Sequence, residues 1–545
     1  MRALLPTIAA TLAIASFCAP AQENRLPNIG SSAGEVLGPA EQQEYGEMML
    51  SQLRHYGYIL EDPLIDGWLR TLGNRLGASS DQPRQDFTFF MMKDRQVNAF
   101  ATVGGYIGAN AGLVLTAESE DEVAAVLAHE IAHVTQSHVL RSVERAQKDS
   151  IPILLAMLGA IAIAQSSGGN SSDDAAMAAM ASAQGLMAQR QIDYTRSNES
   201  EADRLGIRTL ARSGYDPEAM ANMFQRLQAL SRSNQGGERE RTPDYLKTHP
   251  VTTTRISEAK QRAEQLAKDN ITLVTKTPGG ERTERVSKNA FTLPGNAGSD
   301  NPLLPSSLVL TDAGLTQGGS GQFDWARERL RALSADTPEA AIREYERIRR
   351  AGKFTDAQRY GLALARLQDG QGAAAAADLT PLLVEHPGNV WLSLALGQAE
   401  ARAGQKAAAD ARFEGLLDRM PNNRAVALTY AAVLGERNTP EAGKRAVAVL
   451  RPLQSAAADD PLFQTTFARA SEIAGDPVRA GEAYAEAAYL NGRAEQALVQ
   501  LNTLKKRPDL DYYGRTRIDA RIAAITPIVL ELRRQGIRDE DLRRR

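Results

Sequence analysis

The chain has 545 residues and a net charge of −3, and 43% of its residues are hydrophobic and 24% charged. This composition is that of a folded protein, so it excludes a mainly disordered chain and a protein with many membrane spans. No overall positive charge exists to attract nucleic acid, and we therefore expect no nucleic-acid partner.

The first 21 residues have the pattern of a cleavable signal peptide. Arg2 precedes an apolar run over residues 3–15, and Ala19-Pro20-Ala21 follows it, which predicts cleavage after residue 21. The apolar run is shorter than the ~20 residues of a membrane-spanning helix. A short buried helix or an uncleaved anchor is the alternative. Cys18, the one cysteine, lies in this segment, so the exported chain has no thiolate for metal binding or catalysis.

Residues 22–270 are expected to form a first, α+β domain. The predicted elements are, in chain order, helices over 39–60 and 63–76 and strand-like apolar runs over 86–92 and 106–115. A long helix is predicted to start near Ser119, because Ser119 and Glu122 have the spacing of a capping box.

An apolar stretch of 14 residues at 151–164 is followed by the polar segment 166–174. The stretch is too short to span a bilayer. One interpretation is a helical hairpin that packs on its own domain. The other is a hairpin in peripheral contact with a membrane, which its apolar length and polar tip allow.

Residues 271–322 are rich in Gly, Pro, Ser, Thr and Asn, which is typical of a linker. A short strand at 271–276 is the main element that we expect inside it. We expect the regions before and after the linker to have separate hydrophobic cores.

The region 323–540 repeats with a period of 34 residues. Gly370 and Gly404 are one period apart, and the next turn positions fall at Asn438 and, after a slip of three residues, at Gly475. Asn tolerates the left-handed conformation that Gly supplies. A 34-residue period of paired helices resembles tetratricopeptide repeats, which stack into an all-α solenoid. Generic alanine-rich helices are the alternative.

The sequence His129-Glu130-Ile131-Ala132-His133 is an H-E-x-x-H motif inside the predicted long helix. Histidines four residues apart lie on one helix face, about 6 Å apart, so both rings can reach one zinc ion. Glu130 is placed to act as general base toward a water molecule there. The motif predicts the site of a zinc metallopeptidase.

Two carboxylates further along the chain are the best candidates for a third ligand. Glu199 and Asp203 are four residues apart on another predicted helix and share a face. One can bind zinc while the other holds the second nitrogen of a ligand imidazole. Glu201 points elsewhere and is expected to be a surface charge. His138 is nine residues beyond His129 and would face nearly the opposite side of a continuous helix, so we expect a structural polar contact there and no ligand.

The spacing of these motifs resembles that of the zinc peptidases that include HtpX and the CAAX prenyl proteases, with H-E-x-x-H at 129–133 and E-x-x-x-D at 199–203. The signal peptide and the downstream repeats further resemble the periplasmic branch of BepA-like β-barrel assembly-enhancing proteases. Short segments also match that branch: Leu72–Leu76, Asn98–Ala101 with Gly104-Gly105, His133–Gln136 with His138, Glu199–Arg204, and Thr248–Pro250 with Arg255-Ile256.

The resemblance implies a zincin-like metallopeptidase domain with one zinc ion per chain. In this family pattern His129, His133 and Glu199 bind zinc, Glu130 is the catalytic base, and Asp203 orients a ligand. It also implies location in the periplasm, peripheral membrane association being an open alternative.

By the same resemblance, His249 corresponds to a family histidine that can occupy the open zinc position and keep the enzyme latent. Imidazole is a good zinc ligand, so the chemistry allows this role. A loop histidine without a metal role is the alternative.

A substrate-binding strand is expected beside the metal. Tyr106, Ile107, Gly108 and Ala109 begin the second apolar run, and we expect them to form an edge strand that pairs with the substrate backbone. An internal strand is the alternative.

The expected function is therefore hydrolysis of internal peptide bonds in envelope proteins that are unfolded or misassembled. The resemblance implies quality control or assembly of outer-membrane proteins, with the repeats holding clients or contacting the assembly machinery. The alternative is mainly a chaperone or assembly scaffold with a latent protease.

Overall fold

The computed structural model describes residues 37–145, 194–233, 244–277, 280–287, 320–534 and 536. The expected signal peptide and the apolar stretch at 151–164 lie outside these residues. Within the described part of the chain, no helix is both long and apolar enough to cross a membrane.

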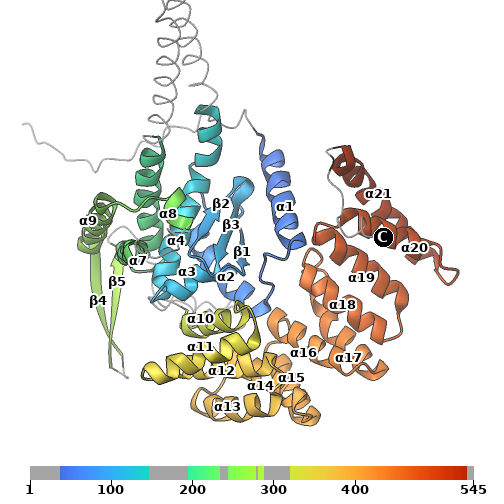
Figure 1. Ribbon diagram of the computed structural model, residues 1–545. Helices are drawn as coiled ribbons and strands as arrows, with labels where there is room; N and C mark the ends of the chain where they lie inside the picture. The colour runs from blue at the N-terminus through green and yellow to red at the C-terminus, as the bar shows by residue number, and fades with distance from the viewer. Residues whose placement is uncertain are drawn as a thin grey trace, which may run out of the picture.

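A small sheet lies at the centre of the first region (Figure 1). Its strands are β1 (Thr88–Met92), β2 (Ala99–Ala101) and β3 (Tyr106–Asn110). The middle strand is β3, which runs parallel to β1 and antiparallel to β2, and all its residues are buried. The prediction that Tyr106, Ile107, Gly108 and Ala109 form an edge strand is wrong, because both sides of β3 are already paired. An unbroken apolar run is typical of a strand buried on both faces.

Helices surround this sheet. They are α1 (Pro39–His55), α2 (Pro63–Ala78), α3 (Ala111–Thr116), α4 (Glu120–Thr135), helical residues 138–145 and 194–212, α7 (Ala219–Ser233), α8 (Asp244–Thr248) and α9 (Thr253–Asp269). The predicted helix start near Ser119 is confirmed, since the Glu122 N–H donates to Ser119 Oγ over 3.3 Å. The capping box is only half formed, because the Glu122 carboxylate accepts from the Glu118 N–H instead.

The segment that we expected to be a linker begins as a β-hairpin. Its strands β4 (Asn270–Thr277) and β5 (Gly280–Ser287) pair antiparallel, which confirms the strand predicted at 271–276. The next described residue is 320, and α10 begins soon after it.

The second half is a run of paired helices. They are α10 (Phe323–Leu333), α11 (Pro338–Ala351), α12 (Asp356–Gln368), α13 (Gly372–Glu385), α14 (Val390–Arg402), α15 (Lys406–Arg419), α16 (Arg424–Glu436), α17 (Pro440–Leu450), α18 (Pro461–Ile473), α19 (Pro477–Leu490), α20 (Ala494–Lys505) and α21 (Tyr512–Arg534). The turn residues Gly370, Gly404 and Gly475 have φ of 78°, 82° and 83°, and Asn438 has φ of 51°. The predicted turn positions of the 34-residue repeat are thus confirmed.

The helical array curves beneath and beside the first region (Figure 1). Helix α10 packs on α2 and α3, and α16 packs on α2. Trp68 of α2 and Phe323 of α10 lie 6.5 Å apart between ring centres. One cluster of buried hydrophobic residues runs from α2 through α4 and α10 to α16 and beyond. The expectation of separate cores is therefore wrong: the amphipathic faces of both regions are buried against each other.

Buried polar contacts also join the two regions. Arg329 of α10 donates to both carboxylate oxygens of Asp62, the N-cap of α2, over 2.8 and 2.6 Å. The backbone N–H and the hydroxyl of Ser320 both donate to the Glu120 carboxylate at the start of α4. The array is thus attached to α2 and to α4, the helix that carries the H-E-x-x-H motif.

Candidate metal centre

Helix α4 carries three side chains toward one buried point. His129 and Glu130 are 0% and 1% exposed, and the His133 side chain is 12% exposed. The Nε2 atoms of His129 and His133 are 3.0 Å apart. Both rings therefore present the same nitrogen to one point, as histidines one helical turn apart can.

The helix at 194–212 brings the two carboxylates to the same place. Glu199 has one oxygen 3.4 Å from His129 Nε2 and the other 3.4 Å from His133 Nε2. Asp203 lies behind it, with Oδ1 2.9 Å from Nδ1 of His129. The structure thus places Glu199 on the side of the converging nitrogens and Asp203 on the opposite edge of the His129 ring.

His249 completes the cluster from the position directly after α8, a helix of five residues that ends at Thr248. Its Nδ1 lies 2.9 Å from Glu199 Oε1 and 3.4 Å from His129 Nε2, and its Nε2 lies 3.7 Å from Glu130 Oε1. The ring stacks on Tyr245 with 4.7 Å between ring centres. The backbone N–H of His249 donates to the Tyr245 carbonyl, which holds the segment in place.

These four side chains fit a tetrahedral divalent metal. One ligand atom each from His129, His133, Glu199 and His249 lie within 4.8 Å of one another. Ligands of a tetrahedral zinc, bound at about 2.0–2.1 Å, are about 3.3 Å apart. Here His129 Nε2 lies 3.0 Å from His133 Nε2 and 3.4 Å from His249 Nδ1, and Glu199 approaches each of the three imidazoles to 2.9–3.4 Å with one or the other of its two oxygens. Imidazole nitrogens and a carboxylate oxygen are also the donors that zinc accepts.

Arg255 of α9 fixes both carboxylates. Its Nε and Nη2 donate to the two oxygens of Asp203 over 2.7 and 2.8 Å, and its Nη1 lies 2.9 Å from Glu199 Oε2. Nη1 also donates to the Pro250 carbonyl, directly after His249. One buried guanidinium therefore links the helix of the carboxylates to the segment that carries His249.

The electrostatics of the site keep the carboxylates ionised. Burial opposes ionisation of Asp203, but hydrogen bonds from Arg255 and His129 outweigh it and lower the Asp203 pKa. Burial likewise opposes ionisation of Glu199, yet its contacts with the imidazoles hold its pKa far below the usual range. Burial disfavours the charged form of His129, but the Asp203 and Glu199 hydrogen bonds raise its pKa to about 10. The site thus favours positive charge at its centre.

The helix of the H-E-x-x-H motif ends earlier than the sequence suggests. Ser137 has φ of 53°, a left-handed conformation that breaks the helix between residues 135 and 138. His138 is therefore turned back onto His133, with 2.9 Å between their Nδ1 atoms. The continuous helix that we assumed for His138 is wrong, although His138 lies outside the group of converging ligand atoms.

Sequence reasoning missed further residues of the site. Glu201 was expected to be a surface charge, but its Oε2 lies 3.2 Å from Nε2 of His138. Arg255 stood in a matched segment without a role, and Tyr245 carried no signal. The one clue to Arg255 was indirect. Buried carboxylates are almost always paired, so two buried acids require a basic residue that neutralises them.

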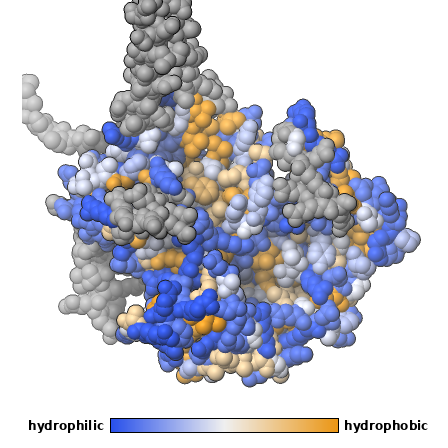
Figure 2. Space-filling model, in the orientation of Figure 1, coloured by the Kyte–Doolittle hydropathy of each residue, from blue (hydrophilic) through white to orange (hydrophobic). Residues whose placement is uncertain are grey.

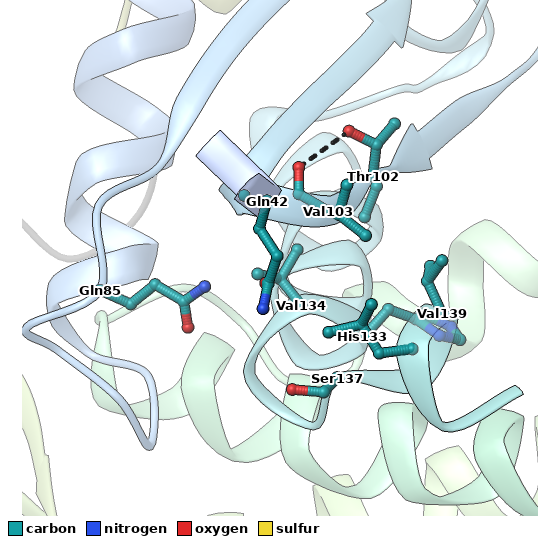
Figure 3. Close-up of a pocket in the computed structure, with 11 residues that line it drawn as sticks. Gln42, Gln85, Thr102, Val103, His133, Val134, Ser137 and Val139 are labelled. Atoms are coloured by element: carbon teal, nitrogen blue, oxygen red, sulfur yellow. Dashed lines mark hydrogen bonds between the residues drawn. The ribbon is translucent and has the colours of Figure 1, made fainter. Parts of the chain in front are cut away.

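A recess lies beside the metal ligands (Figure 3). Its lining residues come from α1, the loop between α2 and β1, the end of β2 and the turn after it, the end of α4 and the helical segment that follows: Gln42, Gln85, Ala101, Thr102, Val103, Gly104, His133, Val134, Ser137, Val139 and Leu140. The recess therefore gives access to His133 from the open side of β2.

Hydrophobic side chains gather on the surface near this recess (Figure 2). Val139 and Val143, on the helical segment 138–145, are each 43% exposed. The helical array on the same face is mostly hydrophilic (Figure 2). Exposed apolar patches commonly mark interaction sites.

Comparison with known proteins agrees with this geometry. Residues 63–263 match the model of "Peptidase family M48". The chain is 30% identical to a β-barrel assembly-enhancing protease of Yersinia pestis, over 92% of each chain. The chain belongs to peptidase family M48. It is also 29% identical to the β-barrel assembly-enhancing protease of Escherichia coli strain K12, over 95% of each chain. A putative protease of the same name in Vibrio cholerae is 40% identical over 47% of this chain and 51% of its own.

As an M48 metallopeptidase, the chain has its metal-binding group at His129, His133 and Glu199, with His249 beside them. The family match covers α2 to α9, so it includes every residue of the cluster. The similarity to the Yersinia and Escherichia proteins extends across the helical array as well.

Proposed function

We propose that the protein is a zinc-dependent endopeptidase that acts on β-barrel outer-membrane proteins during their assembly and quality control. The observation that carries the proposal is the convergence of His129, His133 and Glu199 beside the buried carboxylate of Glu130, in a chain similar over 92% of its length to a β-barrel assembly-enhancing protease. Zinc is the proposed ion, one per chain, because the donors and their spacing suit a tetrahedral site.

The proposed mechanism assigns each side chain a role. Zinc bound there would polarise the scissile carbonyl and make a water molecule more acidic. Glu130 takes the proton of that water and delivers it to the leaving amine, as a general base and then a general acid. Its Oε1 has no hydrogen-bond partner among the described residues, so it is free to accept the proton. Asp203 holds the His129 ring in its ligand orientation.

The substrate strand is proposed to lie along the outer edge of β2. Asn98 and Thr102 direct their backbone bonds toward β3, so the backbone groups of Ala99 and Ala101 point to the open side. An extended segment paired there would pass the recess beside His133. Backbone pairing accepts many sequences, which suits unfolded clients.

We propose three parts for the exported chain: a peptidase region at 22–270, a connection at 271–322 and a repeat region at 323–540. The repeats would hold clients or contact the outer-membrane assembly machinery. The periplasm is the proposed location, because residues 1–21 have the signal-peptide pattern and the rest of the chain has no cysteine.

Substitution of the proposed base tests the enzymatic function. Glu130→Gln should retain one zinc per chain and lose cleavage of casein, because the amide cannot accept the proton. Metal analysis and casein cleavage on both proteins measure this. Unchanged cleavage by Glu130→Gln would contradict the role of Glu130 as general base. A wild-type protein without zinc would contradict zinc as the bound ion.

The position of His249 favours a second candidate function, a chaperone or scaffold with a latent protease. His249 belongs to the group of residues with converging ligand atoms, where one of its nitrogens would fill the fourth position that catalysis needs. If Glu130→Gln still rescues the envelope defect of a null strain, binding of clients is the main activity.

A variant of His249 separates latency from catalysis. If His249 fills the fourth position, His249→Ala should raise basal proteolysis of casein with zinc still near one per chain. A loss of activity on every substrate, with zinc unchanged, would instead assign His249 to stabilising the developing oxyanion.

A further inference from the structure

A metal-ligating imidazole must keep its proton on the nitrogen that faces away from the metal. Beside this nitrogen of His129 lies a carboxylate, since Asp203 Oδ1 is 2.9 Å from Nδ1. The corresponding nitrogen of His133 is met by another imidazole, because Nδ1 of His138 lies 2.9 Å from it. The two ligands on α4 are therefore supported in different ways.

His138 is itself fixed on its far side. The residue is 3% exposed, and its Nε2 lies 3.2 Å from Glu201 Oε2. The same oxygen of Glu201 accepts from Nη1 of Arg141 over 3.2 Å. The left-handed Ser137 turns His138 into this position. A chain of contacts thus runs from Glu201 through His138 to His133.

We propose that His138 and Glu201 are positioning residues that fix the metal-binding tautomer of His133. An ionised carboxylate only accepts, so the His138 proton must sit on Nε2, toward Glu201. Nδ1 of His138 is then an acceptor and takes the N–H of His133 Nδ1. His133 Nε2 is left with its lone pair toward the metal centre.

The opposite tautomer of His138 is unfavourable for its contacts with both Glu201 and His133. If His138 donated from Nδ1, its Nε2 would place a lone pair against the Glu201 carboxylate. His133 would then carry its proton on Nε2, where it blocks metal binding. Glu201 acts on the metal centre through two rings, as Asp203 does through one. This inference rests on the proposed zinc function.

The proposed roles of His138 and Glu201 are tested by the zinc dissociation constant of the exported protein, which is measured by competition with a chelator. His138→Ala and Glu201→Gln should each weaken zinc binding by roughly 10–100-fold, as losses of residues behind a ligand do. Glu258→Gln is the matched control, because it removes an acid that pairs with Arg262 one turn away on α9. The control should leave zinc affinity unchanged.

The conservative variant His138→Asn separates positioning from mere packing. Its carboxamide oxygen can take the place of Nδ1 and accept from His133, but it cannot reach Glu201. We expect zinc affinity close to that of the wild type, and no further loss when Glu201→Gln is added. The visible spectrum of the cobalt-substituted protein should change in His138→Ala and return in His138→Asn.

Two results would overturn the proposal. One is wild-type zinc affinity in both His138→Ala and Glu201→Gln. The other is a further loss from Glu201→Gln in the His138→Asn background, which would mean that Glu201 acts by another route. Zinc content and casein cleavage of the wild type are measured alongside. If the wild type lacks zinc and casein cleavage, the zinc function itself is contradicted. If the wild type has both and the variants bind zinc equally well, only the proposed roles of His138 and Glu201 are contradicted.

Discussion

Single residues of the site differ in how far the sequence reveals them. The sequence predicts the relative positions of His129, Glu130 and His133, because helical geometry fixes them from the spacing alone. Glu199 and Asp203 follow from the same rule on a second helix. Arg255 contacts Asp203 across 52 positions of sequence, and only the packing of α9 decides that distance. No local pattern encodes such a contact.

Arg255 gives the first prediction. Arg255→Lys keeps the charge but loses the planar fork that holds both oxygens of Asp203 and reaches Glu199 at once. Zinc affinity should fall by roughly 10–100-fold, and the melting temperature should drop, because two buried carboxylates lose partners. Chelator competition and thermal unfolding measure the two effects.

Arg262→Lys is the control for this variant, since Arg262 forms a half-exposed ion pair with Glu258 on the same helix. It should change neither quantity measurably. Wild-type zinc affinity in Arg255→Lys would show that the Arg255 guanidinium is not needed to hold the two carboxylates.

At the scale of elements, the approach of two helices forms the metal centre. Glu199, Asp203 and Gly206 share one face of the helix at 194–212 and point to α4. A Cβ on Gly206 would lie 3.1 Å from the backbone nitrogen of His129. The glycine therefore lets the carboxylates come within reach of the histidine rings.

Gly206 gives the second prediction. Gly206→Val should push the helix away from α4 and weaken zinc binding, because the extra methyl groups meet backbone that cannot move freely. Gly67→Val is the control, since nothing lies within 4 Å of a Cβ on Gly67 of α2. Both variants gain helix propensity over glycine. Equal zinc affinity in the two proteins would contradict the role of Gly206.

Periodicity predicted most elements but neither the place of β3 in the sheet nor the end of α4. An apolar run tells that a strand is buried and not which neighbours pair with it. The break at Ser137 was invisible because serine is not a residue that marks a left-handed turn. Where Gly or Asn occupies such turns, as at Gly404 and Asn438, the sequence predicted them.

At the scale of the whole molecule, charged residues line the contact between the peptidase helices and the repeats. Asp66 of α2 pairs with Arg424 of α16 over 3.3 Å, near Asp62 and Asp460. Burial raises the pKa of Asp66 from its usual 3.8 to about 7, against the opposing effect of Arg424. Asp62 and Asp460 raise it further by repulsion.

Asp66 gives the third prediction. A carboxyl with a higher pKa in the folded chain favours folding at low pH, and this contribution is lost as the pH rises from about 4 to about 7. Asp66→Asn removes the titration. Its melting temperature relative to the wild type should therefore rise across that pH range. The exposed Asp324→Asn is the matched control, and a pH-independent difference for Asp66→Asn would contradict the raised pKa of Asp66.

The arrangement of the two halves was beyond the sequence. Each half has amphipathic helices, and the apolar face of a helix does not indicate which surface packs against it. The Arg329–Asp62 pair and the Trp68–Phe323 contact join residues more than 250 positions apart. A glycine-rich segment between them favoured separate cores, whereas in the structure the largest hydrophobic cluster extends across both halves.

The central claim is that the cluster around His129 is a zinc centre. Anomalous X-ray diffraction at the zinc absorption edge, on crystals of the exported protein, tests it most directly. We predict one peak per chain between Nε2 of His129, Nε2 of His133 and the Glu199 carboxylate. A zinc-loaded protein with its peak elsewhere, for example at the more exposed group Asp356, Glu385 and His386, would contradict the claim.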